Sequence, residues 1–252
     1  MLDVDGLSMH FGGVKALTDV TFSVGPTELV AIIGPNGAGK TSLFNCLNGV
    51  YKPTAGSIRF GGQELVGKRP SRIAELGMAR TFQNLALFTN LDVVANLMLG
   101  RHHLMRSGFF SGAMWFGRSR REEHLHRERC EEIVDFLDLG AYRGRPVGVL
   151  PYGIQKRIEL GRGLAMEPQL LLLDEPAAGM NPEETDQLAD TILAVQADLS
   201  IAMLLVEHDM HLVMDIADRV VALNFGEVMA IGRPDDVAAD ETVIAAYLGA
   251  EE

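Results

Sequence analysis

The feature that most constrains this chain is the octapeptide from Gly34 to Thr41, Gly-Pro-Asn-Gly-Ala-Gly-Lys-Thr. It follows Leu29–Ile33, a continuous apolar run typical of a strand that a parallel sheet buries on both faces. An apolar pattern with helical spacing begins just after it, at Leu43. Glycines let the backbone curl so that successive N–H groups point inward, and the following helix adds the positive end of its dipole. The order of strand, glycine loop and helix therefore predicts a phosphate-binding loop in an α/β fold.

Each residue of this loop is a candidate for binding the phosphates of a nucleotide. The Lys40 ammonium can supply positive charge to the terminal phosphates, and the Thr41 hydroxyl is an oxygen ligand that suits Mg²⁺. The candidate phosphate-binding residues are Gly34, Pro35, Asn36, Gly37, Ala38, Gly39, Lys40, Thr41 and Ser42. ATP with Mg²⁺ is the ligand pair that this chemistry favours.

Polar side chains follow two further apolar runs, each predicted to be a buried strand. Asp174 and Glu175 come directly after Leu170–Leu173, and His208 comes shortly after Ile201–Val206. Carboxyl ends of parallel strands meet at one edge of an open α/β sheet, where ligands bind. We expect Asp174 to hold Mg²⁺, Glu175 to polarise an attacking water, and His208 to contact the terminal phosphate. Taken alone, however, His208 has a packing or capping role as its alternative explanation.

Composition excludes several other classes of protein. The chain has 252 residues, enough for one large domain or two closely associated subdomains, and its formal net charge is −12. An acidic chain is a poor candidate for binding nucleic acid, which favours basic surfaces. The apolar runs are far shorter than the roughly 20 residues of a membrane helix, and the first ten residues do not look like an export leader. We therefore expect an intracellular protein that reaches a membrane only through a partner.

The segment from Arg101 to Arg129 differs in composition, because arginines and histidines alternate there with aromatic residues. Aromatic residues among arginines can bind nucleic acid, and histidines can bind metal. Acidic residues are interleaved, however, and no cysteine or aspartate completes a ligand set. The composition favours a solvated helical hairpin. The four histidines are His102, His103, His124 and His126, and the interleaved acidic residues are Glu122, Glu123 and Glu128.

With the segment Leu150–Arg157, Leu-Pro-Tyr-Gly-Ile-Gln-Lys-Arg, these motifs resemble those of an ABC-transporter ATPase over nearly the whole chain. The segment occupies the place of the family's signature, and the resemblance implies that Tyr152 and Gly153 contact nucleotide. It also implies that Phe11 stacks on adenine and that Gln83 senses Mg²⁺ and the γ-phosphate. The remaining matches are the catalytic glutamate Glu175, the switch histidine His208 and Asn181, which ends the D-loop.

The resemblance implies a particular organisation of the chain. We expect a P-loop NTPase (RecA-like) α/β core with an antiparallel β subdomain, formed by residues 1–84 and 165–252. A helical subdomain that carries the signature is expected to be inserted at residues 85–164. Together they would form a single ABC transporter domain.

Several details resemble the first ATPase subunit of branched-chain amino acid importers, among them the Leu-Pro-Tyr-Gly signature and the Glu207–Met210 segment. The resemblance implies a second ATPase subunit, identical or different, two membrane permeases and, indirectly, a binding protein. A groove near Leu85–Leu91 would receive the permease, although these apolar residues are equally expected as core. The chain would lie peripherally on the cytoplasmic face of the inner membrane. ATPases for urea, amide or aromatic-acid import, or for lipopolysaccharide export, share much of the pattern.

Two positions depart from the family's signature. Pro151 stands where the family has a serine that donates to the γ-phosphate on the opposing subunit, and Ile154 replaces a glutamine. Proline has neither a hydroxyl nor an N–H group, so one donor to a charged group is lost, worth about 1.5–3 kcal/mol. These departures leave open a regulatory subunit with a degenerate signature, or a transporter in which one of two ATP sites is weaker.

Overall fold

The structure is a computed structural model that describes residues 1–81, 87–105 and 118–248. The chain divides into two compact units. The first consists of Met1–Arg80 and Gln169–Glu252, and the second is Thr81–Pro168. From the sequence alone we expected the boundaries at residues 84/85 and 164/165.

The first unit contains a four-stranded antiparallel sheet in the order β2-β1-β4-β5. Alternate residues of its longer strands are buried, as expected for a sheet with one face against a core. A hairpin joins the two long strands, and Leu2 pairs with Val24 at its open end. The strands are β1 (Leu2–Phe11), β2 (Val14–Val24), β4 (Ala55–Phe60) and β5 (Gln63–Glu64).

A six-stranded sheet in the order β10-β9-β3-β8-β7-β6 forms the centre of the same unit. All neighbouring strands run parallel except β9 and β10, which form an antiparallel hairpin. Every residue of the three central strands is buried, which explains their unbroken apolar runs. The strands are β3 (Leu29–Ile33), β6 (Met78–Arg80), β7 (Leu170–Asp174), β8 (Ala202–Val206), β9 (Arg219–Asn224) and β10 (Glu227–Gly232).

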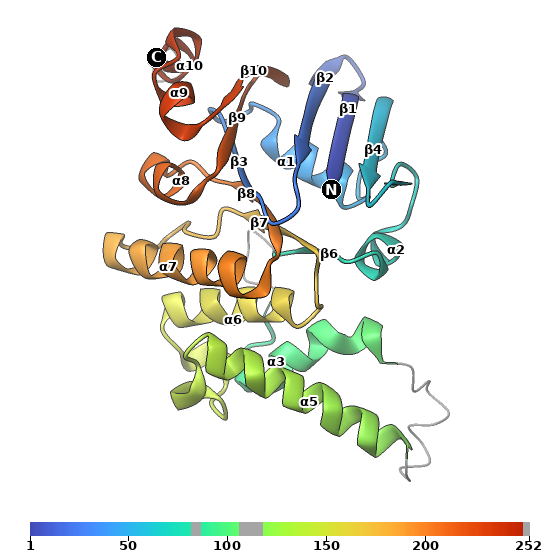
Figure 1. Ribbon diagram of the computed structural model, residues 1–252, viewed down its shortest axis with the longest axis vertical. Helices are drawn as coiled ribbons and strands as arrows, with labels where there is room; N and C mark the ends of the chain where they lie inside the picture. The colour runs from blue at the N-terminus through green and yellow to red at the C-terminus, as the bar shows by residue number, and fades with distance from the viewer. Residues whose placement is uncertain (82–86, 106–117, 249–252) are drawn as a thin grey trace. The chain divides into compact units, whose positions relative to one another are not determined.

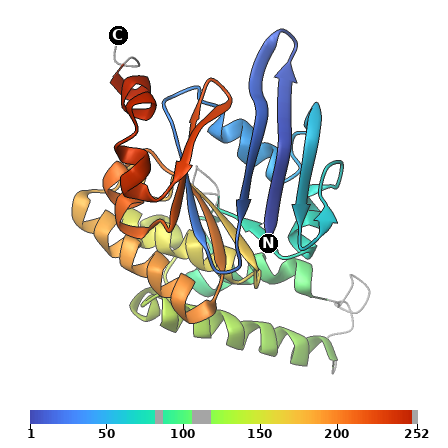
Figure 2. The same ribbon diagram turned by 45° about the horizontal axis from the view of Figure 1, so that its top comes forward.

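Helix α1 (Lys40–Leu47) lies between the two sheets (Figures 1 and 2). Its buried residues Leu43, Phe44 and Leu47 join one core with inward-facing residues of both sheets. This core holds the start of α1, and so the phosphate loop, against the large sheet. The other helices of this unit are α2 (Pro70–Glu75), α7 (Pro182–Leu199), α8 (Met210–Ile216), α9 (Pro234–Ala238) and α10 (Glu241–Leu248).

The second unit is helical. Asp92 caps its first long helix by accepting a hydrogen bond from the Ala95 N–H at 2.7 Å. The buried side chain of Asn96 binds the loop before that helix, accepting from the Phe88 N–H at 2.9 Å. The α-helices are α3 (Val93–Gly100), α5 (Arg118–Phe136) and α6 (Tyr152–Leu164); the 3₁₀ helices are η1 (Arg101–Leu104), η2 (Gly140–Tyr142) and η3 (Val147–Val149).

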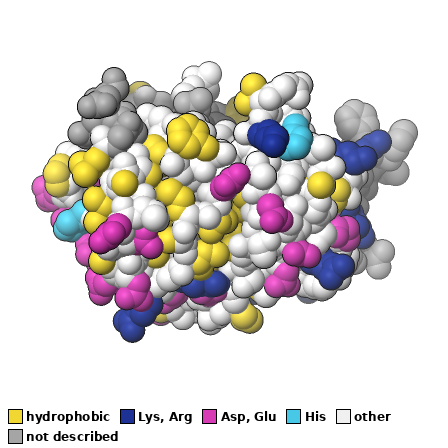
Figure 3. Space-filling view, turned by 90° about the horizontal axis from the view of Figure 1, so that it is seen from above, with side chains coloured by type: hydrophobic (Ala, Val, Ile, Leu, Met, Phe, Trp, Pro, Cys, Tyr) yellow, Lys and Arg dark blue, Asp and Glu magenta, His cyan; other side chains and the backbone are white. Residues whose placement is uncertain are grey.

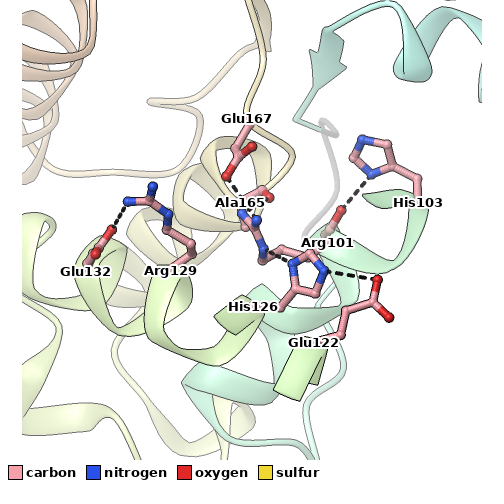
Figure 4. A network of polar contacts seen from close by, with 9 residues as sticks. Arg101, His103, Glu122, His126, Arg129, Glu132, Ala165 and Glu167 are labelled. Carbon is pink, nitrogen blue, oxygen red and sulfur yellow. Dashed lines mark hydrogen bonds and ion pairs between the residues drawn. The ribbon is translucent and has the colours of Figure 1, made fainter. Parts of the chain in front are cut away.

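A buried polar cluster in this unit corrects the expectation that the whole Arg101–Arg129 segment is solvated. Arg101 and His126 are 3% and 6% exposed. Arg101 Nε donates to His126 Nδ1 at 2.9 Å, and the rest of its guanidinium binds the Ala165 carbonyl and the Glu167 carboxylate (Figure 4). The two side chains face each other because η1 continues from α3, which packs against α5, a contact that local composition does not reveal. The segment's residues 106–117 lie outside the described part of the chain.

The structure bears on three of the classes that composition addressed. No helix in the described part of the chain has the length and apolar character to cross a membrane. Likewise, the described histidines, cysteines and acidic residues include no group of three or more arranged to hold a metal ion. On the face shown in Figure 3, acidic side chains lie between hydrophobic ones, and the described basic side chains form no continuous patch.

Candidate nucleotide-binding site

The loop from Gly34 to Thr41 joins β3 to α1 and has a backbone that only glycine fits well at two positions. At Gly34 φ is +149°, and a Cβ would lie 2.1 Å from the Leu223 carbonyl oxygen. At Gly39 φ is +103°, and a Cβ would lie 2.6 Å from the Ala16 carbonyl oxygen. These contacts press the loop against neighbouring backbone, so its glycines are needed for close approach as well as for conformation.

Lys40 crosses this loop from the first turn of α1. Its ammonium group donates to the carbonyl oxygens of Gly34 at 2.5 Å and Pro35 at 3.1 Å, and the residue is 8% exposed. Burial lowers the pKa of Lys40, while the nearby Glu175 carboxylate opposes that shift. A buried cation held by carbonyl dipoles is well suited to bind an anion.

The strand register brings the loops that follow β3, β7 and β8 to one edge of the sheet. Asp174 pairs with Val206 on β8, and Val206 pairs with Ile32 on β3. The phosphate loop begins two residues after Ile32, Glu175 follows Asp174, and Glu207 follows Val206. The structure thus brings these loops together at the edge where ligands bind in open α/β sheets.

Asp174 is buried and forms a short ion pair with Arg80, the last residue of β6. The distance from Arg80 Nη2 to Asp174 Oδ2 is 2.6 Å, and the side chains are 12% and 2% exposed. The same guanidinium donates to Asn45 Oδ1 at 2.8 Å and lies 5.6 Å from the centre of the Phe44 ring. Arg80 therefore joins Asp174 to helix α1, the helix that follows the phosphate loop.

Glu175 has a left-handed backbone conformation, with φ of +48°, that is rare for a residue other than glycine. Its N–H donates to the Val206 carbonyl at 2.9 Å, which keeps this turn against β8. A conformation of this kind costs of order 1–3 kcal/mol, which the surrounding contacts must offset. The chain then reaches Asn181, which with Glu184 forms a capping box at the start of α7.

His208 extends into solvent from the loop between β8 and α8, and its side chain is 62% exposed. Asp209, next along the chain, accepts from the N–H groups of His211 and Leu212 and so caps α8. The preceding Glu207 is 0% exposed, and its carboxylate accepts hydrogen bonds from the backbone N–H groups of Ala177 and His208. The backbone of His208 is thus held by Glu207, while most of its imidazole faces solvent.

Phe11 lies at the end of β1 and is 42% exposed. Its ring meets the ring of Tyr51 edge to face, with the ring centres 5.1 Å apart. An exposed aromatic ring that a second ring holds in place is a suitable surface for stacking a flat base.

Other candidates lie in the second unit or outside the described residues. Tyr152 and Gly153 form the first turn of α6, at the positive end of the helix dipole. Gln83 and Leu85 lie outside the described residues. Of the expected docking residues, Leu87 is buried, while Phe88 and Leu91 are 58% and 38% exposed.

Sequence reasoning missed two residues that organise the site, Arg80 and Glu207. Arg80 ends a strand of three residues, too short for a period to be visible. Glu207 follows an apolar run, and a lone acidic residue there was the only signal. Their partners lie 94 and 30 residues away in sequence, so local patterns contain no trace of the contacts.

The donor set fits a nucleotide with Mg²⁺. A glycine-rich loop with a buried lysine suits phosphate, and the Thr41 hydroxyl and Asp174 carboxylate are the hard oxygen ligands that Mg²⁺ prefers. Thr41, Asn36 and Gly37 are exposed, so the loop is open to a ligand from solvent. With a carboxylate and a histidine beside it, this edge can orient and activate water at a phosphate.

Comparison with known proteins agrees with this geometry. Residues 17–178 match the family model described as ABC transporter, and residues 227–252 match the model described as branched-chain amino acid ATP-binding cassette transporter. The chain is 42% identical to the high-affinity branched-chain amino acid transport ATP-binding protein BraF of Pseudomonas aeruginosa and 41% identical to LivG of Escherichia coli. In both comparisons the match covers 99% of this chain and 98% of the relative.

A solved structure gives the same result for the fold. An ATP-binding cassette of an ABC transporter in its ADP conformation superimposes with a TM-score of 0.86 at 28% identity, covering 99% of this chain and 98% of that one. The expected P-loop fold with an antiparallel sheet and helical parts is therefore confirmed. From its site, its sequence and its fold, this chain belongs to the ATP-binding proteins of the ABC transporter family.

Proposed function

We propose that this chain hydrolyses ATP to power an importer of branched-chain amino acids. The observation that carries the chemistry is the meeting of the Lys40 loop, the Asp174–Glu175 turn and the His208 loop at one sheet edge. Identities of 41–42% over almost the full length of two branched-chain amino acid transport proteins support the solute class, as does the match at residues 227–252.

In this proposal the chain acts by positioning and by electrostatic stabilisation. Phe11 stacks on adenine, and the backbone of Gly34–Thr41 surrounds the phosphates with N–H donors. Lys40 exchanges its carbonyl partners for terminal phosphate oxygens. When bound, Mg²⁺ neutralises charge that builds on those oxygens, with Thr41, Asp174 and Gln83 as the residues proposed to hold it.

Two residues act on the attacking water. Glu175 accepts its proton or orients it toward the γ-phosphate, since its backbone is fixed at the end of β7. His208 contacts the γ-phosphate and steadies the water, and its exposed ring can turn toward the phosphate without displacing the buried Glu207. The products are ADP and inorganic phosphate, and their charge repulsion favours release.

The partners follow from this role. A second ATPase subunit, identical or different, would close over each nucleotide with its signature, and Tyr152 and Gly153 of this chain would do the same for the partner's nucleotide. Two permease subunits would dock near Leu85–Leu91, where Phe88 and Leu91 are exposed, and a binding protein would act through them. The chain would then lie peripherally on the cytoplasmic face of the inner membrane.

Reconstitution in lipid vesicles tests the proposal. The transporter assembled from this chain and its partner subunits should take up leucine, isoleucine or valine only with ATP inside the compartment that faces this chain. Lys40→Ala should abolish uptake while the complex still assembles. Uptake of urea, an amide or an aromatic acid in place of these amino acids would contradict the solute assignment and leave the ATPase assignment intact.

One observation favours a second candidate, a regulatory subunit with a degenerate signature. Pro151 caps α6 without a side-chain hydrogen bond and has no hydroxyl to offer a γ-phosphate. Silencing each ATP site in turn distinguishes the candidates. If the two ATPase subunits are unlike, the site completed by this chain's signature should contribute less to turnover than its sister, and equal losses would contradict that asymmetry.

A further inference from the structure

Glu207 is the most completely buried carboxylate beside the site, with 0% exposure. A buried carboxylate must be compensated by hydrogen bonds or charge, because removing an ion from water costs several kcal/mol. Glu207 Oε1 accepts from the Ala177 N–H at 2.9 Å. Its other oxygen, Oε2, accepts from the N–H groups of His208 at 2.9 Å and Asp209 at 3.3 Å.

These donors belong to different loops. Ala177 lies two residues after Glu175, in the loop that joins β7 to α7. His208 and Asp209 lie in the loop that joins β8 to α8. One carboxylate therefore connects the loop of the candidate general base to the loop of the candidate switch histidine, with one oxygen for each loop.

The surrounding backbone makes this connection stiff. The Glu207 N–H donates to the Ile32 carbonyl at 3.4 Å, and the Glu175 N–H donates to the Val206 carbonyl at 2.9 Å. Glu207 is thus anchored next to β3, the strand that ends in the phosphate loop. The imidazole of His208 also lies nearby, with Nδ1 3.7 Å from Glu207 Oε2.

We propose that Glu207 is a positioning residue for ATP hydrolysis, whose carboxylate fixes the separation between the loops that carry Glu175 and His208. The inference rests on the proposed function of those two residues. A displacement of about 1 Å at a catalytic group can cost on the order of 10²-fold in rate. Holding both loops with one side chain keeps the water-orienting and phosphate-contacting groups in register.

Glutamine at this position separates positioning from packing. The Glu207→Gln side chain has nearly the same shape but only one oxygen, so its amide nitrogen would face an N–H donor in one of the two loops. Glu207→Asp keeps the charge, and loses one methylene, so it cannot reach both loops. This second variant keeps the inference testable if the glutamine variant does not fold.

Glu28→Gln is a matched control at the opposite edge of the same sheet. Glu28 precedes β3, and its carboxylate accepts from the Gly25 N–H at 2.6 Å and from Arg219 Nε at 2.8 Å. It thus undergoes the same chemical change at a partly buried carboxylate that also binds backbone. A purely structural effect should appear in both variants.

The experiment compares each variant with the unchanged protein. Amide hydrogen exchange and ATP affinity are measured on the full chain, and ATP turnover is measured on the assembled transporter. We expect Glu207→Gln and Glu207→Asp to lower kcat by about 10- to 100-fold, with ATP affinity changed by less than about threefold. In both Glu207 variants, the rate of amide hydrogen exchange at Ala177 and His208 should rise by more than the rate at other amides. Glu28→Gln should lose stability and keep kcat.

The outcomes separate this inference from the function on which it rests. Full turnover in Glu207→Asp or Glu207→Gln, together with inactive Glu175→Gln, would overturn the positioning role alone. Full turnover in Glu175→Gln would instead overturn the proposed catalytic site. Equal losses of kcat in Glu207→Gln and Glu28→Gln would reduce Glu207 to a residue that only stabilises the fold.

Discussion

Replacing Arg80 with methionine tests how strongly the structure holds Asp174 before any ligand binds. Methionine keeps most of the stem's volume but removes the guanidinium that lies 2.6 Å from the Asp174 carboxylate. It also removes the hydrogen bond to Asn45 and the contact with the Phe44 ring. Asp174 then stays buried without this cation, and the end of β7 loses its link to α1.

The expected loss of stability follows from burial and distance. Two unit charges roughly 4 Å apart attract by about 4 kcal/mol at an effective dielectric constant near 20. Breaking a buried pair by removing one member typically costs about 3–5 kcal/mol, because the other charge remains in a poor solvent. With side chains that are 12% and 2% exposed, Arg80 and Asp174 belong to this class. We therefore expect Arg80→Met to lower the free energy of unfolding by about 3–5 kcal/mol.

Urea unfolding of the full chain measures this loss of stability, and a double-mutant cycle shows how much of it is due to the interaction between Arg80 and Asp174. Arg80→Met, Asp174→Asn and the double variant should show a coupling energy of about 2 kcal/mol or more. Arg80→Met should cost less in the Asp174→Asn background, because the buried carboxylate charge is already gone. Arg72→Met is the control, because Arg72 and Glu75 form an exposed pair on α2 whose loss should cost less than about 1 kcal/mol. Additive losses for Arg80 and Asp174 would refute the reasoning.

Two further predictions concern the phosphate loop and the helical unit. Gly34→Ala places a Cβ 2.1 Å from a carbonyl oxygen and should lower the free energy of unfolding in urea by about 3 kcal/mol or more. Gly37→Ala, with open space around its Cβ, should lower it by only about 1 kcal/mol. Equal losses in the two variants would contradict the close approach at Gly34. Burial, and then the neighbouring Arg101, lower the pKa of His126, so the unfolded chain takes up a proton more readily. The stability due to His126 is complete above about pH 6.5 and declines as the pH falls below it. His126→Gln should flatten that decline in urea unfolding between about pH 7.5 and pH 5.5, and an unchanged slope would contradict the assignment.

Much of the candidate nucleotide site can be proposed from the sequence because its signals are local. The glycine loop, the buried strands and the polar residues at their ends are contiguous patterns, and the parallel topology follows from the apolar runs. Long-range pairs were not predictable. The Arg80–Asp174 pair joins residues 94 positions apart, and Arg101 reaches His126 across 25 positions. In neither pair does the local composition around the two residues show that their side chains are buried rather than solvated.

Single-turnover hydrolysis by Glu175→Gln, with ATP affinity measured on the same protein, tests the central claim most directly. If Glu175 activates water beside the Lys40 loop, the variant in the assembled transporter should bind ATP within about threefold of the unchanged chain. Its hydrolysis rate should fall by about 10²–10⁴-fold. A hydrolysis rate equal to that of the unchanged chain would contradict the account of this site.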